Sequence, residues 1–137
     1  MNRSGYSYDL CDTWELIRWR GAVVSAIRGA RGQALLREMA EVLDAMPVKR
    51  LIRGAFEHDG EVCALGAVAQ ARGTDVSDLD TKNRKQIALT FGIAEALAAE
   101  IMFWNDANFG CPSVTPERRW QIMRGWVAEA IAPEPRP

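Results

Sequence analysis

His58 and Cys63 are the residues of this chain whose types are best suited to catalysis. Histidine is the commonest general base, and a cysteine thiolate is a strong nucleophile. His58 is the only histidine, and it falls in an expected turn where no partner is spaced to orient it. Cys63 lies between Val62 and Ala64, in apolar surroundings typical of a core residue rather than of an activated thiolate. We therefore expect no catalytic residue, and a protein that is not an enzyme.

Metal ligands and phosphate-binding loops are not indicated either. The three cysteines and the single histidine have no CxxC or HxxxH spacing, and the odd cysteine count argues against a disulfide framework. Asp75, Asp78 and Asp80 lack the alternating order of a calcium loop, which favours a solvated acidic loop over residues 74–81. The glycines at 29 and 32 are too close together for a phosphate loop and follow no strand. We expect no metal and no cofactor.

Arginines dominate the segment from Leu16 to Arg37, which contains five of them and no acidic residue. Arginine interleaved with glycine and tryptophan is typical of a surface that contacts phosphates. Arg20 falls within the apolar arc of the expected helix, so its guanidinium either pairs with a carboxylate, such as an acid of the hairpin, or reaches a ligand. The candidate site for a ligand or partner joins this segment to a later Asn-Asp pair: Arg18, Trp19, Arg20, Arg28, Arg31, Asn105 and Asp106.

A helix-turn-helix pattern also matches residues 68–79. Ala69, Gly73 and Leu79 fall where that motif needs a small residue, a turn glycine and an apolar residue. Arg72, however, occupies a position that is usually apolar, and the second helix would begin among aspartates, which DNA phosphates repel. A DNA-binding regulator that uses this element is therefore the alternative function, and it ranks below a binding protein that uses the arginines.

Apolar periodicity and capping residues predict a mainly α (α+β) fold, with five to six helices and one short β-hairpin. Asp12 and Glu15 form a capping box for the first helix, and Thr115 followed by Pro116 marks the start of the last. An Asp-Gly pair at 59–60 suits a hairpin turn, because both residues tolerate positive φ. The expected helices cover residues 12–28, 33–46, 64–72, 83–91, 93–104 and 115–132, and the expected strands cover 50–56 and 62–63. The first two helices are expected to pack antiparallel.

The chain of 137 residues is expected to form one globular domain over residues 12–132, with a flexible arm at 1–11 and a disordered tail at 133–137. Net charge is −1, but it is unevenly spread: residues 57–80 hold one basic and six acidic residues, whereas residues 1–56 hold nine basic and six acidic ones. The first residues are too polar for a signal peptide, and no apolar run has membrane-spanning length. We expect a cytoplasmic protein with no membrane partner.

The segment Asp59-Gly60-Glu61-Val62-Cys63-Ala64-Leu65-Gly66 resembles an element of small uncharacterised proteins of bacteriophages and prophages. In that family a DG-x-x-C-x-LG strand-to-helix element precedes a G-[LI]…ND helix and a closing helix. The second element corresponds to residues 92–106 here, and the closing helix to residues 115–131. The stretch from 18 to 34 is similar to phage proteins as well. The chain departs from the commoner pattern in having one cysteine after the Asp-Gly turn rather than two, and a longer loop over 107–114.

The resemblance implies a phage- or prophage-encoded accessory protein that acts by binding, in the cytoplasm of the host bacterium. Small phage accessory proteins often counter host defences by masking an effector or by sequestering a nucleotide signal. The implied partner is a host protein or a phosphate-bearing ligand, and nucleic acid binding and a homo-oligomer stay open. An enzyme would instead require a pocket that joins Cys63 or His58 to carboxylates.

Overall fold

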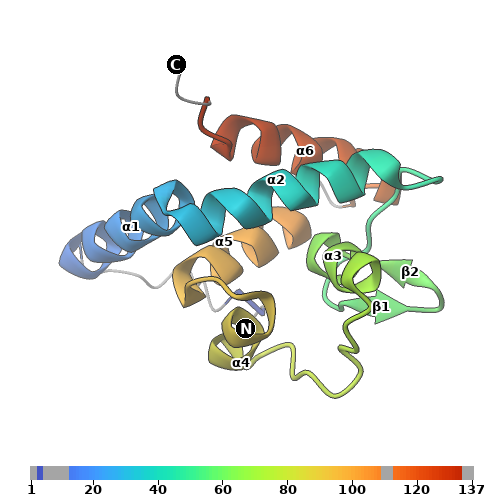
Figure 1. Ribbon diagram of the computed structural model, residues 1–137, viewed down its shortest axis with the longest axis horizontal. Coiled ribbons are helices and arrows are strands. Elements are labelled where there is room, and N and C mark those ends of the chain that lie inside the picture. Colours follow the sequence, from blue (N-terminus) through green and yellow to red (C-terminus); the bar gives the residue numbers. More distant parts are fainter. Residues whose placement is uncertain (1–2, 5–12, 109–112, 134–137) are drawn as a thin grey trace.

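The computed structural model describes residues 3–4, 13–108 and 113–133 of the chain (Figure 1). Within these residues the chain forms six helices and one two-stranded antiparallel sheet, so the prediction of a mainly α fold with a small hairpin is confirmed. The elements, in chain order, are α1 (Thr13–Arg28), α2 (Ala30–Ala45), β1 (Glu57–His58), β2 (Glu61–Val62), α3 (Ala64–Arg72), α4 (Arg84–Phe91), α5 (Glu95–Asp106) and α6 (Pro116–Ala130).

The hairpin turns at the Asp-Gly pair, as predicted. Asp59 and Gly60 have φ values of 51° and 81°, both in the left-handed region that this turn requires. The first strand, however, covers Glu57–His58, so the prediction of a strand over 50–56 is wrong. Gly54 has a φ of 79°, and its amide donates to a carboxylate of α5 rather than to a neighbouring strand. The chain is therefore diverted from the sheet before β1 begins.

The junction of α1 and α2 differs from the prediction. Helix α2 begins at Ala30 rather than at residue 33, and Gly32 lies within its first turn. A Cβ atom at Gly32 would lie 2.0 Å from the carbonyl oxygen of Ala26, so this glycine permits a close approach of the two helices instead of interrupting one. Helix α2 leads away from the end of α1 in Figure 1, and the expected antiparallel packing is wrong. Helix α1 packs on α5, whereas α2 packs on α3 and α6.

Helix α5 is the centre of the fold. Its residues from Ala96 to Met102 are buried, and it contacts α1, α3, α4 and α6. Gly92 separates α4 from α5 with a φ of 72°, as its sequence position predicted. The predicted loop at Asn105-Asp106 is wrong, because both residues belong to the last turn of α5. Asn and Asp side chains usually end a helix by hydrogen bonding to the nearby backbone. Here the two side chains bond to distant parts of the chain instead, so the helix continues through them.

The last helix follows its sequence signals closely. Thr115 Oγ1 accepts a hydrogen bond of 3.1 Å from the Arg118 amide, and Pro116 is the first helical residue. Met123 and Val127 are fully buried against the core. The rings of Trp104 and Trp126 stack with a centroid distance of 6.0 Å, which joins α6 to α5.

Several predictions fall on residues that the structure does not describe. The Asp12 cap, most of the arm at 1–11, residues 109–112 of the loop after α5 and most of the tail at 133–137 lie outside the described residues. Two residues assigned to the arm are described, and they are not loosely placed: Arg3 is 6% exposed and Ser4 is 1% exposed. No single described helix is long and apolar enough to cross a membrane; α4 and α5 meet the requirement only together, and they are bent by 100° at their junction.

Candidate functional site

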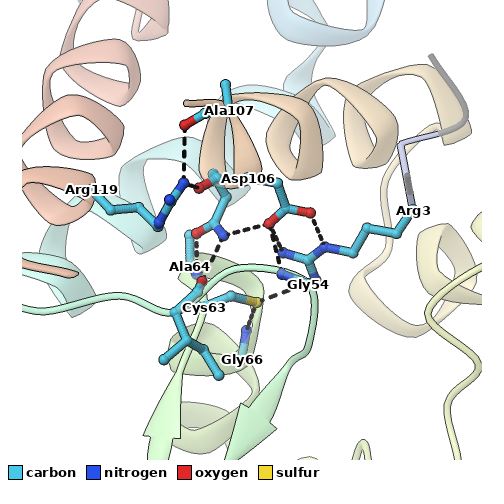
Figure 2. Close-up of polar contacts among 10 residues, drawn as sticks. Arg3, Gly54, Cys63, Ala64, Gly66, Asp106, Ala107 and Arg119 are labelled. Carbon is cyan, nitrogen blue, oxygen red and sulfur yellow. Dashed lines mark hydrogen bonds and ion pairs between the residues drawn. The ribbon is translucent and has the colours of Figure 1, made fainter. Parts of the chain in front are cut away.

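The predicted site residues fall in two separate places. Four of them lie on α1, and Arg31 lies at the start of α2. We call the four arginines of this stretch, Arg18, Arg20, Arg28 and Arg31, the basic face. Asn105 and Asp106 belong to a cluster of polar side chains at the C-terminal end of α5 (Figure 2). Among the described residues, neither of these two side chains makes a hydrogen bond or ion pair with an arginine of the basic face.

The carboxylate of Asp106 holds the guanidinium of Arg3 in a bidentate ion pair. Arg3 Nε and Nη2 donate to Asp106 Oδ2 and Oδ1 over 2.6 and 2.8 Å. The Arg3 side chain is 3% exposed and that of Asp106 is 13% exposed. Burial opposes ionisation of Asp106, but the hydrogen bonds from Arg3 and its neighbours outweigh it and hold the pKa of Asp106 below its ordinary value. Burial likewise lowers the pKa of Arg3, but the adjacent sulfur and carboxylate more than compensate and raise it.

Asn105 uses its amide group to join three segments. Its Oδ1 accepts a hydrogen bond of 3.0 Å from the amide of Ala64, the first residue of α3. Its Nδ2 donates to the carbonyl oxygen of Ile52 and to Asp106 Oδ1, both over 2.9 Å. The side chain is fully buried, and both of its polar atoms are engaged. Asn105 is therefore a structural residue and has no free polar atom to offer a ligand.

Cys63 caps α3 and touches the same arginine. Its Sγ accepts a hydrogen bond of 3.3 Å from the Gly66 amide and another of 3.6 Å from Arg3 Nη1. The residue is fully buried, as the sequence predicted. A Cβ atom at Gly66 would lie 1.9 Å from the carbonyl oxygen of Phe56, so α3 starts in direct contact with the segment that leads into β1. The guanidinium of Arg3 also lies over the Phe56 ring, with Arg3 Cζ 5.5 Å from the ring centroid.

Arg119 of α6 closes the other side of the cluster. Its Nη1 donates to the carbonyl oxygens of Asn105 and Ala107 over 2.6 and 3.0 Å, and its Nη2 donates to Asn108 Oδ1 over 3.0 Å. A cation at this position satisfies the unpaired carbonyls at the end of α5. Sequence reasoning missed Arg119 and Arg3. The spacing of Arg119, Met123 and Trp126 places this arginine on the buried face of α6 and could have revealed it, whereas no spacing points to Arg3.

Arg20 pairs with a buried acid of α5. Its Nη1 lies 3.0 and 3.1 Å from the two carboxylate oxygens of Glu100, whose side chain is 3% exposed. Trp104 Nε1 donates to the same carboxylate over 3.4 Å. The prediction of an internal ion pair for Arg20 is confirmed, but its partner is Glu100 rather than an acid of the hairpin. Trp19 is half-buried, and the guanidinium of Arg84 lies over its ring, with Arg84 Cζ 5.7 Å from the ring centroid.

The rest of the basic face is open to solvent. Arg18, Arg28 and Arg31 are exposed and form no ion pair with the described part of the chain. Two large apolar side chains of α1 lie exposed beside them, Ile17 at 57% and Val24 at 41%. A shallow hollow of about 620 Å³ follows this side of α1, and it is lined by Arg20, Gly21, Val24, Ser25, Arg28 and Gly29.

The residues considered for catalysis, metal binding and DNA binding lie elsewhere. His58 is exposed in β1, its Nε2 3.2 Å from a carboxylate oxygen of Asp59, and it does not contact the buried Cys63. No group of three or more potential metal ligands occurs within the described residues. The segment from 74 to 83 contains no helix, because the Asp75 and Asp80 carboxylates bond to the amides two residues ahead and form turns. The prediction of a second helix for the helix-turn-helix match is therefore wrong.

Comparison of the chain with models of protein families, with curated proteins and with solved structures finds no match in any of the three.

Proposed function

We propose that this chain is a phage- or prophage-encoded accessory protein that acts by binding, and that the basic face of α1 and the start of α2 is its contact surface. The observation that carries the proposal is the exposure of Arg18, Arg28 and Arg31 beside the exposed apolar side chains of Ile17 and Val24. Protein surfaces that bind partners combine apolar contact area with arginine in this way.

The chemistry of this face selects an anionic partner. Guanidinium groups bind carboxylates and phosphates through paired hydrogen bonds, and three of them here have no ion-pair partner among the described residues. The hollow along α1 is open and lined by a single helix, whereas a site for a small nucleotide encloses most of its ligand. This shape supports an acidic surface of a host protein as the partner, and masking of a defence effector rather than sequestration of a nucleotide signal.

The phage origin rests on the resemblance of residues 59–66, 92–106 and 115–131 to small phage proteins. The place of action is then the cytoplasm of the infected bacterium. Within the fold these motif residues form the hairpin, the start of α3, the central helix and the closing helix. Their role is architectural, which suits a family whose members share a framework and vary their contact surface.

Phage plating on bacteria that carry individual defence systems tests the proposal. We expect the chain to restore plaque formation against at least one system, and the double variant Arg18→Glu/Arg28→Glu to abolish the effect while remaining folded. Arg118→Glu is the matched control, because Arg118 is an exposed arginine of α6, far along the chain from the basic face. Restoration that survives the double variant would contradict the basic face as the contact surface, and no restoration in a broad panel would contradict the accessory role.

DNA is the second candidate partner, because an acid-free run of arginines also suits a phosphate backbone. The helix-turn-helix element no longer supports this reading, so the basic face would have to carry it. Binding of random duplex DNA at micromolar protein that weakens steeply with salt, and that is lost in the same double variant, would favour DNA over an acidic protein. An absence of binding at low salt would remove this candidate.

A further inference from the structure

We propose that the pocket formed by Asp106, Cys63, Phe56 and the Gly54 amide is a binding site for an arginine followed by a small residue in a peptide, and that the chain's own Arg3-Ser4 segment, which forms a turn, fills it in this structure. We call this pocket the arginine socket. The ligand class is a peptide segment of a protein partner. The socket is anionic, whereas the basic face of α1 is cationic, so this inference is independent of the function proposed above.

The arginine socket recognises each part of a guanidinium. Asp106 accepts two hydrogen bonds from one edge of Arg3, through Nε and Nη2. Cys63 Sγ accepts one from the opposite nitrogen, Nη1, over 3.6 Å. The ring of Phe56 lies 5.5 Å from the central carbon. A lysine ammonium cannot form the bidentate pair, so the arrangement discriminates between the two basic residues.

The groups of the socket are also held by bonds other than those of Arg3. The Gly54 amide and Asn105 Nδ2 bond to Asp106 Oδ1 over 3.1 and 2.9 Å, which fixes the carboxylate. Asn105 is itself fixed by the backbone of Ile52 and Ala64. The Gly66 amide fixes the sulfur of Cys63. A preorganised site of this kind binds its ligand without first having to reorder its own groups.

The residue after the arginine is also recognised. The Ser4 carbonyl oxygen accepts a hydrogen bond of 3.4 Å from Arg84 Nη1, which adds a main-chain contact to the side-chain contacts of Arg3. Ser4 is 1% exposed, so the residue is covered and a small side chain suits this position. These two contacts favour a peptide over free arginine, because free arginine has no following residue and carries a carboxylate there instead.

An empty socket would leave the Asp106 carboxylate buried without a counter-charge, which is strongly unfavourable. The buried carboxylate therefore requires a positive charge beside it, and the group that supplies this charge can be exchanged for another. Arg3 and its socket come from distant parts of the chain, since Arg3 is separated from Cys63 by 60 positions and from Asp106 by 103. While Arg3 occupies the socket, an outside peptide must displace it, and its apparent affinity is reduced by the fraction of time the socket is filled.

The experiment opens the socket and offers it a matched pair of peptides. In the variant Arg3→Ala, binding of N-acetyl-Arg-Ser-amide is followed through the amide NMR signals of Gly54, Ala64 and Gly66, which surround the socket. We expect saturable shifts of these signals, binding about tenfold or more weaker for N-acetyl-Lys-Ser-amide, and weaker binding for N-acetyl-Arg-Trp-amide and free arginine. The variant Arg53→Ala is the control, because it removes an exposed arginine beside the socket and leaves Arg3 in place.

Three results would overturn the inference. They are no saturable shift in folded Arg3→Ala, equal binding of the lysine and arginine peptides, and binding to Arg53→Ala as tight as to Arg3→Ala. If Arg3→Ala is unfolded alone, the arginine peptide must restore the folded spectrum, since a ligand that binds only the folded state stabilises it. The variant Arg3→Lys keeps the positive charge and hence the fold. It is then titrated with the same peptides, and the arginine peptide should displace its lysine from the socket. If neither Arg3→Ala nor Arg3→Lys responds to the arginine peptide, the socket is rejected as a binding site.

Discussion

Asp106 retains its charge in a buried position because three donors of the described part of the chain surround its carboxylate. Arg3, the Gly54 amide and Asn105 Nδ2 all direct hydrogens at its two oxygens. These interactions stabilise the ionised form in the folded state only, since the unfolded chain offers ordinary water instead. The pKa of Asp106 is therefore lower in the folded protein than in the unfolded one, and folding is coupled to pH through this residue.

The variant Asp106→Asn tests that coupling. A carboxyl group with a lowered pKa in the folded state stabilises the protein above its unfolded pKa of about 3.9, and this contribution is lost as pH falls through the folded value. We expect the substitution to reduce the free energy of unfolding at pH 7 by about 3 to 5 kcal/mol, because it leaves Arg3 buried without its counter-ion. We also expect a flatter dependence of the unfolding temperature on pH below 4.

Thermal unfolding measured from pH 2 to 7 gives both quantities. Asp78→Asn is the control, because Asp78 is exposed in the acidic loop and its substitution removes the same charge without touching the bonds of Asp106. Equal slopes for Asp106→Asn and the unsubstituted protein would contradict the assigned role of Asp106.

Arg20 gives a second test at the residue scale. Removing its side chain leaves Glu100 buried without the arginine, but Arg20 is itself 51% exposed, so solvent screens the pair and limits the loss. We expect Arg20→Ala to lower the free energy of unfolding by about 1 to 2 kcal/mol. Arg18→Ala, two positions earlier and exposed, should change it by less than about 0.5 kcal/mol. Urea titrations decide the matter, and equal losses for the two variants would show that the Glu100 pair contributes nothing specific.

At the scale of the elements, the start of α3 is set by contact with a neighbouring segment as much as by helix propensity. Cys63 supplies the cap, and Gly66 lets the first turn rest on the backbone at Phe56. A methyl group there would overlap the Phe56 carbonyl oxygen, which is backbone and cannot rotate away. The glycine of the LG pair therefore has a packing role that its helical position alone does not reveal.

Two glycine-to-alanine substitutions separate packing from propensity. Gly66→Ala should lower the free energy of unfolding by about 3 kcal/mol, because the added Cβ would lie 1.9 Å from the Phe56 oxygen. Gly125→Ala, in the middle of α6 with nothing within 4 Å of its added Cβ, should raise it by about 0.5 to 1 kcal/mol through the better helix propensity of alanine. Chemical denaturation compares the two, and a stabilising Gly66→Ala would contradict the close contact.

Features that depend on neighbours in sequence were predictable at this scale. The Thr115 cap, the turn at Asp59-Gly60 and the break at Gly92 each follow from the local preferences of a few residues, and the structure has all three. The direction of α2 relative to α1 and the continuation of α5 through Asp106 were not predictable in this way. Both depend on contacts with segments distant in the sequence, which periodicity does not report.

At the scale of the whole molecule, the same distinction separates the two halves of the candidate site. The basic face was predictable, because five arginines without an intervening acid stand out in the sequence. The arginine socket was not, because its members come from both sides of the hairpin and from α5, and the arginine that fills it comes from before α1. Asn105 and Asp106 were correctly singled out as unusual, but their contacts lie with Arg3 and the backbone rather than with the basic face.

The buried thiol of Cys63 reports on the integrity of this whole assembly. It is fully buried at the point where α3, the hairpin and α5 meet. We expect its alkylation by iodoacetamide, followed at the Cys63 peptide by mass spectrometry, to be slow while Arg3 fills the socket and to rise with urea in parallel with tryptophan fluorescence. In Arg3→Ala the thiol should react faster in the absence of urea. Rapid reaction of the unsubstituted native protein would show instead that the socket opens locally.

The bonds around Asp106 also bear on how fast the fold forms and how long it lasts. Those from Gly54 and Arg3 join residues separated by 52 and by 103 positions, so each of them requires the closure of a long loop. Contacts of this kind form late, after the helices and the core have come together. Substitutions at the cluster are then expected to leave the refolding rate almost unchanged and to accelerate unfolding. The cluster determines the lifetime of the native state, whereas the core determines how readily that state is reached.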